Sequence, residues 1–316
     1  MRVGAAHTVI TPPPGIWLAG FAARRDPAIG VHDDLYARAM VFEDRGSRLG
    51  IVVCDLCELD AGFVAAVRER AEEQAGISAG ALLVAATHTH AAPATFQLYS
   101  QPPDRAWLGE VVERTAGAVA QAAERLSVAD LTVAVGQETT IARNRRRPHG
   151  PVDPTVTVLR AGRGALPAAY FLHYACHPTV LGPDNLLISR DYVGFAVDAL
   201  ARATGGWAMF ANGACADINV GHSADRSALG LPIPGRTFER AEALGQRLAA
   251  EAGRALADAR PAVVGEGQRR TLAANRRAVL VPLRPAPRPE DARRAVVSWR
   301  ERVRALEQAG ATLETQ

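Results

Sequence analysis

Short apolar runs alternate with longer helix-like segments along most of this 316-residue chain, and this alternation restricts the folds open to it. The runs have the length and the bounding turn residues of buried strands, while the longer segments space their apolar residues as helices do. Strands are expected at 3–10, 36–42, 49–55, 81–86, 131–135, 156–159, 168–174, 207–211 and 263–272. Helices are expected at 61–74, 107–126, 190–203, 238–257 and 290–307, and Ser189 is the expected N-cap of the third helix. This order predicts an α/β fold, a mixed β-sheet with helices packed on its faces.

Charge and composition exclude several classes of function. The formal net charge is only +3, which gives no electrostatic reason to expect a nucleic-acid partner or an anionic membrane surface. All 36 basic residues are Arg, so lysine Schiff-base chemistry is excluded. No apolar run approaches the length of a membrane span, and the N-terminus lacks the apolar core of a signal peptide. We therefore expect a cytoplasmic protein without an integral membrane segment.

The four cysteines agree with a reducing compartment. Cys54 and Cys57 have CxxC spacing, but a zinc ribbon needs a second such pair, which the sequence does not contain. We interpret both as buried structural thiols, because free cysteine is among the most buried residue types. A redox pair at these two positions is the alternative.

The tetrapeptide Thr87-His88-Thr89-His90 follows the apolar run at 81–86. Alternate residues of an extended chain point to the same side, so His88 and His90 are expected to share one face. α/β sheets commonly bind ligands at such strand ends. Two imidazoles there predict half of a metal site, or one metal ligand beside an acid–base group. A pair of polar loop histidines is the alternative.

Two further strand ends carry residues suited to the same site. His177 lies in Cys176-His177-Pro178 after the strand expected at 168–174, and Asp217 and Asn219 follow the strand expected at 207–211. Zinc accepts imidazole nitrogen and carboxylate oxygen, and a catalytic site combines about three protein ligands with a water. Residues from separate strand ends can therefore form one zinc site. Taken alone, a histidine such as His177 is more often a hydrogen-bonded core or loop residue than a metal ligand.

Several motifs in a fixed order carry a family resemblance. They are residues 4–14, Gly30-Val31-His32 followed by Tyr36-Ala37-Arg38-Ala39, Ala86-Thr87-His88-Thr89-His90, Asn144-Arg145, Cys176-His177-Pro178, Ser189-Arg190-Asp191-Tyr192-Val193-Gly194 and residues 213–219. In this order they resemble the neutral/alkaline (non-lysosomal) ceramidases, and particularly the shorter bacterial proteins that are similar to the N-terminal catalytic domain of that family. The resemblance covers residues 3–250 and implies a catalytic domain over residues 1–275.

The resemblance implies a zinc-dependent hydrolase of an amide, or of a related C–N or ester bond, in a small-molecule or lipid-like substrate. It makes His88 and His177 zinc ligands. It makes His90 the residue that handles protons or the oxyanion, and Arg145 the active-site arginine. These roles agree with the chemistry of the side chains. Zinc would polarise the carbonyl and lower the pKa of a bound water, His90 titrates near neutrality, and Arg145 can hold an oxyanion or a carboxylate.

Two departures from the family pattern shape the expected mechanism. The family carries its nucleophilic serine in a Gly-Asp-x-Ser-Pro pattern, where this chain reads Ala216-Asp217-Ile218-Asn219-Val220. An amide side chain cannot act as that nucleophile, so water activated by the metal must attack, and Asp217 and Asn219 are left as substrate-binding residues. Ceramide itself is therefore not the expected substrate.

The second departure concerns the remaining zinc ligands. The family takes a Glu and a Tyr from a later segment, and no matching segment follows residue 263. Asp55, Asp217 and His32 are the candidate replacements. A catalytically degenerate member that binds a metal or a small ligand without turnover is the alternative function.

The C-terminal region 276–316 differs from the rest of the chain. A Pro/Arg-rich linker precedes the Arg/Glu-rich helix expected at 290–307, whose apolar residues fall on one stripe. They are Ala295, Val296, Trp299, Val303 and Leu306. Such a stripe needs a partner surface. We interpret the region as the start of a longer C-terminal segment, or as a surface that joins copies of the chain into a homo-oligomer.

Overall fold

The computed structural model describes residues 1–316 except 100, 165–166, 229, 260–271, 284 and 309–316. The chain divides into two units, Met1–Asn275 and Arg276–Gln316, each of which is described by itself. The strand expected at 263–272 lies almost entirely outside the described residues.

The strands of the first unit form two principal sheets. The first sheet has the order β5-β4-β3-β1-β6 and contains β1 (Arg2–Val9), β3 (Tyr36–Asp44), β4 (Ser47–Cys54), β5 (Leu82–Ala86) and β6 (Ser127–Val128). The second has the order β12-β10-β9-β7 and contains β7 (Asp130–Gln137), β9 (Thr155–Gly162), β10 (Ala169–Tyr174) and β12 (Trp207–Asn212). Both sheets are mixed, because β4 and β5 are parallel, as are β10 and β12, while the other pairs are antiparallel.

Short elements connect the loops at the ends of these sheets. β2 (Gly30–Val31) pairs in parallel with β11 (Leu187–Ile188), and β8 (Arg143–Asn144) pairs antiparallel with β13 (Ile218–Asn219). A 3-10 turn, η1 (Ala79–Ala81), precedes β5, and the short helix α4 (Ala224–Ala228) follows β13.

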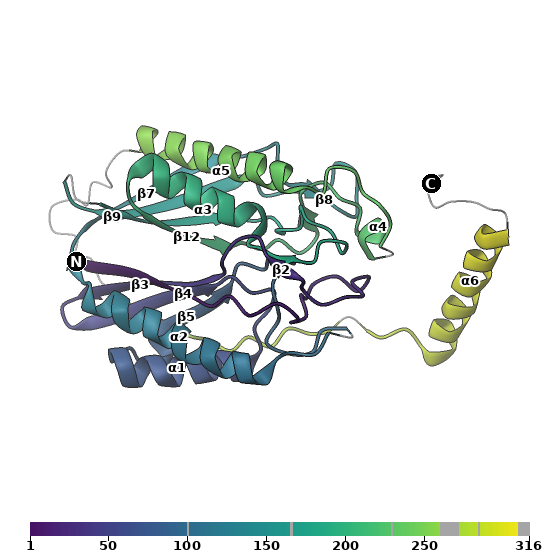
Figure 1. The fold of residues 1–316 in the computed structure, drawn as a ribbon, viewed down its shortest axis with the longest axis horizontal. Helices are drawn as coiled ribbons and strands as arrows, with labels where there is room; N and C mark the ends of the chain where they lie inside the picture. The colour runs from purple at the N-terminus through teal and green to yellow at the C-terminus, as the bar shows by residue number, and fades with distance from the viewer. Residues whose placement is uncertain (100, 165–166, 229, 260–271, 284, 309–316) are drawn as a thin grey trace. The chain divides into compact units, whose positions relative to one another are not determined.

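Helices cover the outer faces of both sheets. α1 (Ala61–Ala75) and α2 (Arg105–Glu124) pack on the first sheet, and α3 (Asp191–Thr204) and α5 (Phe238–Asp258) pack on the second (Figure 1). The inner faces of the sheets meet in a shared core, where Met40 and Phe42 join Met209. The arrangement is therefore helix, sheet, sheet, helix. The expected α/β class, mixed sheets with helices on their faces, is confirmed, and its strands are divided between two sheets.

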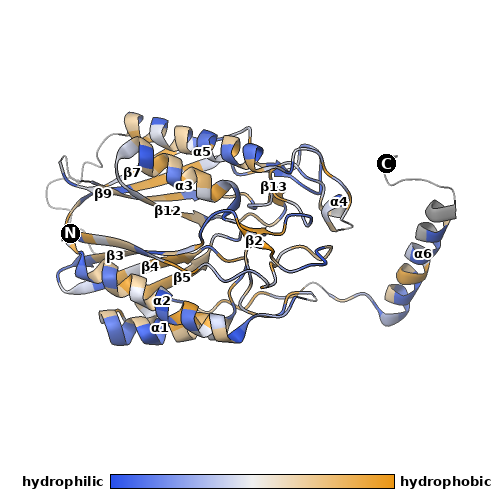
Figure 2. Cartoon of the chain, in the orientation of Figure 1, coloured by the Kyte–Doolittle hydropathy of each residue, from blue (hydrophilic) through white to orange (hydrophobic). Residues whose placement is uncertain are grey.

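The apolar strands follow from this layering. In β3, Ala37, Ala39 and Val41 belong to the core on the helix side, whereas Met40 and Phe42 belong to the core between the sheets. A strand buried on both faces is apolar throughout rather than alternating, which explains the unbroken runs in the sequence. The covering helices carry hydrophilic residues outward and apolar residues toward the sheets (Figure 2).

Helix starts match the sequence except in α3. Asp60 caps α1, because its carboxylate accepts the backbone N–H of Phe63 at 2.7 Å. The expectation that Ser189 caps α3 is wrong, since Arg190 occupies that position. Ser189 Oγ instead accepts the N–H of Asp191 at 3.0 Å. Asp191 has a φ of 55°, so the chain turns sharply just where the helix begins.

In the second unit, α6 (Pro289–Gln308) matches the expected helix. Its first turn holds Asp291, which binds Arg288 at 2.8 Å and also contacts Arg294. Val296 and Trp299 are exposed, while the Val303 and Leu306 side chains of the expected stripe lie outside the described residues. A homo-oligomer through this helix stays a prediction.

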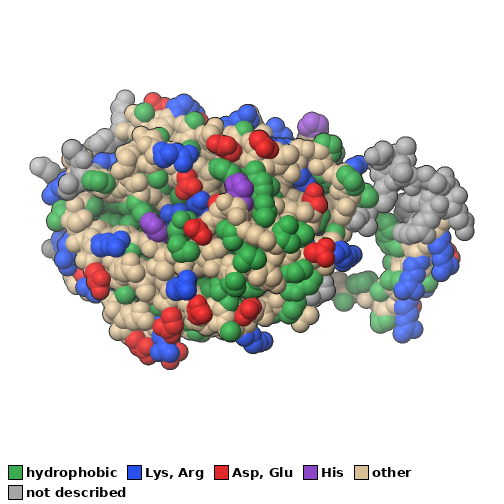
Figure 3. All heavy atoms as spheres, in the orientation of Figure 1, with side chains coloured by type: hydrophobic (Ala, Val, Ile, Leu, Met, Phe, Trp, Pro, Cys, Tyr) green, Lys and Arg blue, Asp and Glu red, His purple; other side chains and the backbone are tan. Residues whose placement is uncertain are grey.

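Two observations bear on the expected partners. On the face shown in Figure 3, basic and acidic side chains are interspersed. Among the described helices, none has the length and apolar character needed to cross a membrane.

Candidate metal centre and active site

Loops from both sheets meet at one edge of the first unit. β4 and β5 of the first sheet and β10 and β12 of the second end there (Figure 1). The potential metal ligands on these loops are Cys57, His88, His90, His177 and Cys215. Asn212, at the end of β12, connects two of the loops: its Nδ2 donates to the carbonyl of Thr87 at 3.3 Å, and its Oδ1 accepts the N–H of Cys176 at 3.2 Å.

The three predicted site histidines lie together. The ring centroids of His88 and His177 are 4.7 Å apart, those of His88 and His90 4.9 Å, and those of His90 and His177 5.6 Å. Residues nearly ninety positions apart in sequence are thus in van der Waals contact.

The sequence predicts that strand alternation places His88 and His90 on one face, but the structure brings these two side chains together in a different way. β5 ends at Ala86, so His88 and His90 lie in the following loop rather than on a strand. His88 has a φ of 69°, a conformation that costs a non-glycine residue on the order of 1–3 kcal/mol. Its N–H donates to the carbonyl of Leu56 at 3.0 Å, which helps to hold this backbone. The left-handed turn, not strand alternation, brings the two imidazoles together.

Hydrogen bonds determine which ring nitrogens face the centre. His88 Nδ1 donates to the Cys57 carbonyl at 2.6 Å, and His177 Nδ1 donates to the Ile218 carbonyl at 2.8 Å. A carbonyl only accepts, so each Nδ1 carries a proton, and in the neutral ring it is Nε2 that carries the lone pair. Metal-binding histidines are typically oriented by such a bond. Burial, followed by His88 and Arg145, lowers the pKa of His177 to about 4, which keeps this ring neutral.

His90 is buried beside the other two rings. Its Nε2 lies 3.4 Å from His88 Nε2, and its ring meets Phe21 edge-on at 4.9 Å between centroids. Burial and the neighbouring His88 lower its pKa well below the ordinary value, so the expectation that His90 titrates near neutrality is wrong. The buried Arg24 supports this segment, because its Nη1 donates to the carbonyls of His90 at 2.9 Å and of Ala19 at 3.0 Å.

Two groups of donor atoms have metal-like spacing among the described residues. In the first, donors of His88, His177 and Cys215 lie within 4.8 Å of one another, and in the second, those of Cys57, His88 and His90 do. Imidazole nitrogen and thiolate sulfur are the donors that zinc prefers. His88 and His177 are both members of the first group, in which Cys215 is the third donor. The residues of this group therefore fit a zinc ion.

Arg145 lies on the turn after β8. Its backbone N–H donates to the Asp217 carbonyl at 2.8 Å, which anchors this turn to the loop after β12. The guanidinium is half-buried, and its charge contributes to the lowered pKa values of His90 and His177. Burial and the neighbouring Arg146 lower the pKa of Arg145 itself. Its Nε has no hydrogen-bond partner within the described part of the chain.

The two predicted substrate-binding residues are engaged in their own loops. Asp217 is half-exposed and pairs with Arg146 at 2.6 Å. Asn219 is buried: its Oδ1 accepts the N–H groups of Gly221 at 2.9 Å and His222 at 3.1 Å, and its Nδ2 donates to the His222 carbonyl at 2.8 Å. One Nδ2 hydrogen is left for another partner, and a substrate-binding role stays a prediction.

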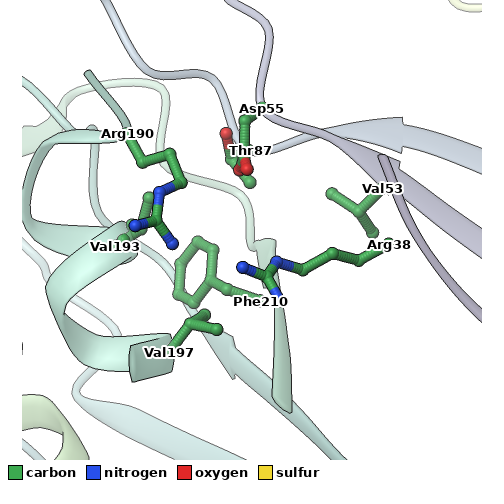
Figure 4. Close-up of a pocket in the computed structure, with 9 residues that line it drawn as sticks. Arg38, Val53, Asp55, Thr87, Arg190, Val193, Val197 and Phe210 are labelled. Atoms are coloured by element: carbon green, nitrogen blue, oxygen red, sulfur yellow. The ribbon is translucent and has the colours of Figure 1, made fainter. Parts of the chain in front are cut away.

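Asp55 and His32 lie outside both donor groups. Asp55 faces Arg38 and Arg190 around a cavity of about 10 Å³ beneath Thr87 (Figure 4), and its Oδ2 accepts the N–H of Tyr36 at 2.9 Å. His32 stacks on Phe238 with 3.7 Å between centroids and bonds to Asp33. Asp55 therefore interacts electrostatically with Arg38 and Arg190, and His32 packs against α5.

The CxxC cysteines are free and buried. Cys54 contacts the Thr115 hydroxyl at 3.6 Å, and burial raises its pKa to about 12. Burial also raises the pKa of Cys57. Thiol exchange needs a thiolate, which this environment disfavours.

An open groove of about 530 Å³ lies beside the candidate metal centre. Its lining includes His88, Cys215 and Glu58 together with apolar side chains, which are those of Leu59, Val64, Val84 and Phe96. The groove can therefore take an apolar group attached to a bond that reacts at the histidines.

Arg24, Asn212 and Cys215 are missing from the sequence prediction. Cys215 could have been found, because it lies in the strand-end loop that also carries Asp217. Arg24 and Asn212 leave no comparable signal, since their contacts depend on loops distant in sequence.

Comparison with known proteins identifies the family. Residues 1–218 match the family described as neutral/alkaline non-lysosomal ceramidase, N-terminal. A curated neutral ceramidase of Mycobacterium tuberculosis is 29% identical over 214 residues, which is 60% of this chain and 34% of that protein.

Solved structures share the fold. A ceramidase complexed with C2 and the neutral ceramidase of Pseudomonas aeruginosa each have a TM-score of 0.70 at 22% identity over 84% of this chain. The chain covers 45% and 46% of those two structures, so it spans less than half the length of each of these three relatives. The resemblance noted in the sequence is confirmed: this chain belongs to the neutral/alkaline non-lysosomal ceramidase family and matches its N-terminal domain.

Proposed function

We propose that the chain forms a zinc-dependent hydrolase of an amide, or of a related C–N or ester bond, in a small-molecule or lipid-like substrate. One observation carries the proposal. His88 and His177 each bind a backbone carbonyl through Nδ1, and a ring nitrogen of each lies within 4.8 Å of the other and of the Cys215 sulfur. Membership of the ceramidase family supports the same class of reaction, because a ceramide is a lipid amide.

The roles follow from the positions of the side chains. His88 and His177 would hold zinc, which when bound polarises a carbonyl and makes water acidic enough to attack near neutral pH. His90, whose Nε2 lies 3.4 Å from that of His88, accepts the proton of the attacking water and delivers it to the departing amine. Arg145 directs its positive charge toward the same histidines and stabilises the oxyanion.

The groove supports an apolar substrate. The apolar side chains of Leu59, Val64, Val84 and Phe96 line the same groove as His88. An acyl chain seated there would place its carbonyl next to the histidines. We therefore favour N-acyl amides over highly polar amides as substrates.

Metal content and turnover test the proposal. The purified chain should retain near-stoichiometric zinc, and His88→Ala/His177→Ala should lose it, because two of the donors are removed. His32→Ala/His149→Ala, which changes two exposed histidines, is the matched control and should retain zinc. N-acyl amides of graded chain length should be hydrolysed by the zinc-loaded chain, and a chelator should stop the reaction. Zinc that is absent, or unaffected by the His88/His177 change, would refute the metal site.

A binding protein without turnover is the second candidate. Asn219 stands where the family carries its nucleophilic serine, and its amide is bound to its own loop. Stoichiometric zinc that depends on His88 and His177, together with no turnover of any amide or ester in the panel, would favour this candidate.

A further inference from the structure

We propose that Cys215 supplies the third protein ligand of the zinc site, which gives a His88–His177–Cys215 centre. This inference rests on the proposed function and concerns the same site. Two imidazoles alone would hold zinc weakly, whereas catalytic zinc sites have three protein ligands and an open position. Neither Asp55 nor His32 belongs to a donor group with metal-like spacing, so a third donor has to come from elsewhere.

The position of the Cys215 sulfur suits this role. Its Sγ lies 4.0 Å from His177 Nε2. Zinc bonds of about 2.3 Å to sulfur and about 2.0–2.1 Å to nitrogen place these two donors roughly 3.6 Å apart in a tetrahedral site and at most about 4.4 Å apart. The observed separation falls between these values, so a shift of a few tenths of an ångström completes the geometry.

One short turn positions both ligands. The Ile218 carbonyl accepts the backbone N–H of His177 at 3.0 Å and its Nδ1–H at 2.8 Å. The N–H of Ile218 in turn donates to the Cys215 carbonyl. Cys215 and His177 are therefore tied to the same residue from opposite sides, and the ring and the thiol are oriented together.

Cys57 is the competing thiol, and its environment is less suitable. It is fully buried, and its carbonyl already accepts the His88 Nδ1 proton. Both cysteines border the groove, but only Cys215 is partly exposed, so zinc and substrate can reach its thiol. When zinc binds, the Cys215 sulfur donates a lone pair to the metal and its proton passes to solvent.

Metal binding to the full-length chain tests the assignment. Cys215→Ala should weaken zinc binding on the order of 100-fold or more, because even loss of a residue that only orients a ligand costs 10–100-fold. Cys54→Ala removes a buried thiol that belongs to neither donor group and is the matched control, with unchanged zinc affinity expected. The cobalt-substituted wild type should show a thiolate-to-cobalt charge-transfer band that Cys215→Ala lacks.

Thiol reactivity provides a second readout, in which Cys215 itself is left unchanged. Cys54, Cys57 and Cys176 are buried, so Cys215 should be the thiol that an alkylating reagent modifies rapidly in the native chain. Added zinc should protect it, and His88→Ala/His177→Ala should abolish that protection.

The outcomes separate this inference from the proposed function. Zinc that depends on His88 and His177 but binds Cys215→Ala as tightly as wild type, with no charge-transfer band, overturns the inference and leaves the hydrolase proposal intact. A wild type that binds no zinc overturns both. Weakened binding in Cys215→Ala together with zinc protection of its thiol supports the three-ligand centre.

Discussion

Gly20 controls the position of His90, and replacing it should displace that ring. Gly20 has a φ of 96°, and a Cβ added there would lie 2.4 Å from Cγ and 2.5 Å from Nδ1 of His90. Gly15 has a nearly identical φ of 94°, but a Cβ added there meets nothing within 4 Å. Gly15→Ala therefore measures the backbone cost alone, whereas Gly20→Ala adds the collision with His90.

The magnitudes follow from these two terms. A residue with a side chain at such a φ costs about 1–3 kcal/mol of unfolding free energy, so Gly15→Ala should lose about that amount. Forcing an extra methyl group into a packed site costs a further 1–3 kcal/mol or so, so Gly20→Ala should lose about 2–6 kcal/mol. The difference between the two variants, about 1–3 kcal/mol, measures the contact with His90.

Urea unfolding of both variants, each also made in a His90→Ala background, is the assay. Truncating His90 removes the ring that a new Cβ would strike, so the excess cost of Gly20→Ala over Gly15→Ala should disappear in that background. Gly20→Ala should also slow amide hydrolysis, because His90 is moved away from His88. If Gly20→Ala costs no more than Gly15→Ala, or if the excess persists without the imidazole, the contact between Gly20 and His90 is not as described.

Two further predictions concern buried groups around the site. Arg24→Met should lower the unfolding free energy by about 3 kcal/mol or more, because the buried carbonyls that Arg24 binds lose a charged donor. Arg25→Met, at an exposed position, is the control and should change the unfolding free energy little. Equal effects of the two variants in urea unfolding would refute this prediction. Burial, followed by Arg236 and Arg240, lowers the pKa of His222 from 6.5 to about 4. The His222 ring of the unfolded chain therefore takes up a proton at higher pH than that of the folded chain. His222 contributes stability above pH 6.5 that is lost as the pH falls through about 4, and the loss of unfolding free energy is at most ~3 kcal/mol. His222→Gln should reduce the loss of unfolding free energy between pH 7 and pH 4.5, and an unchanged loss would contradict the assignment.

The sequence by itself determined the elements and the chemistry of the key side chains. Strands buried on both faces appear as continuous apolar runs, as residues 39–42 of β3 do, and the capping Asp60 marks the start of α1. These signals are local, because they depend on propensity, spacing and side-chain hydrogen bonds within a few residues. The strand-end positions of His88 and His177 could be predicted in the same way, and several motifs in order indicated the family.

Only the tertiary structure decided how these parts combine. The division of the strands into two sheets depends on which faces pack together, as Met40 and Met209 do, and periodicity does not contain that information. The left-handed φ of His88, the carbonyls that orient His88 and His177, and the approach of Cys215 to His177 all result from loops far apart in sequence. A ligand's residue type is local, but its lone pair acquires a direction only when a distant backbone carbonyl accepts the proton on the other ring nitrogen.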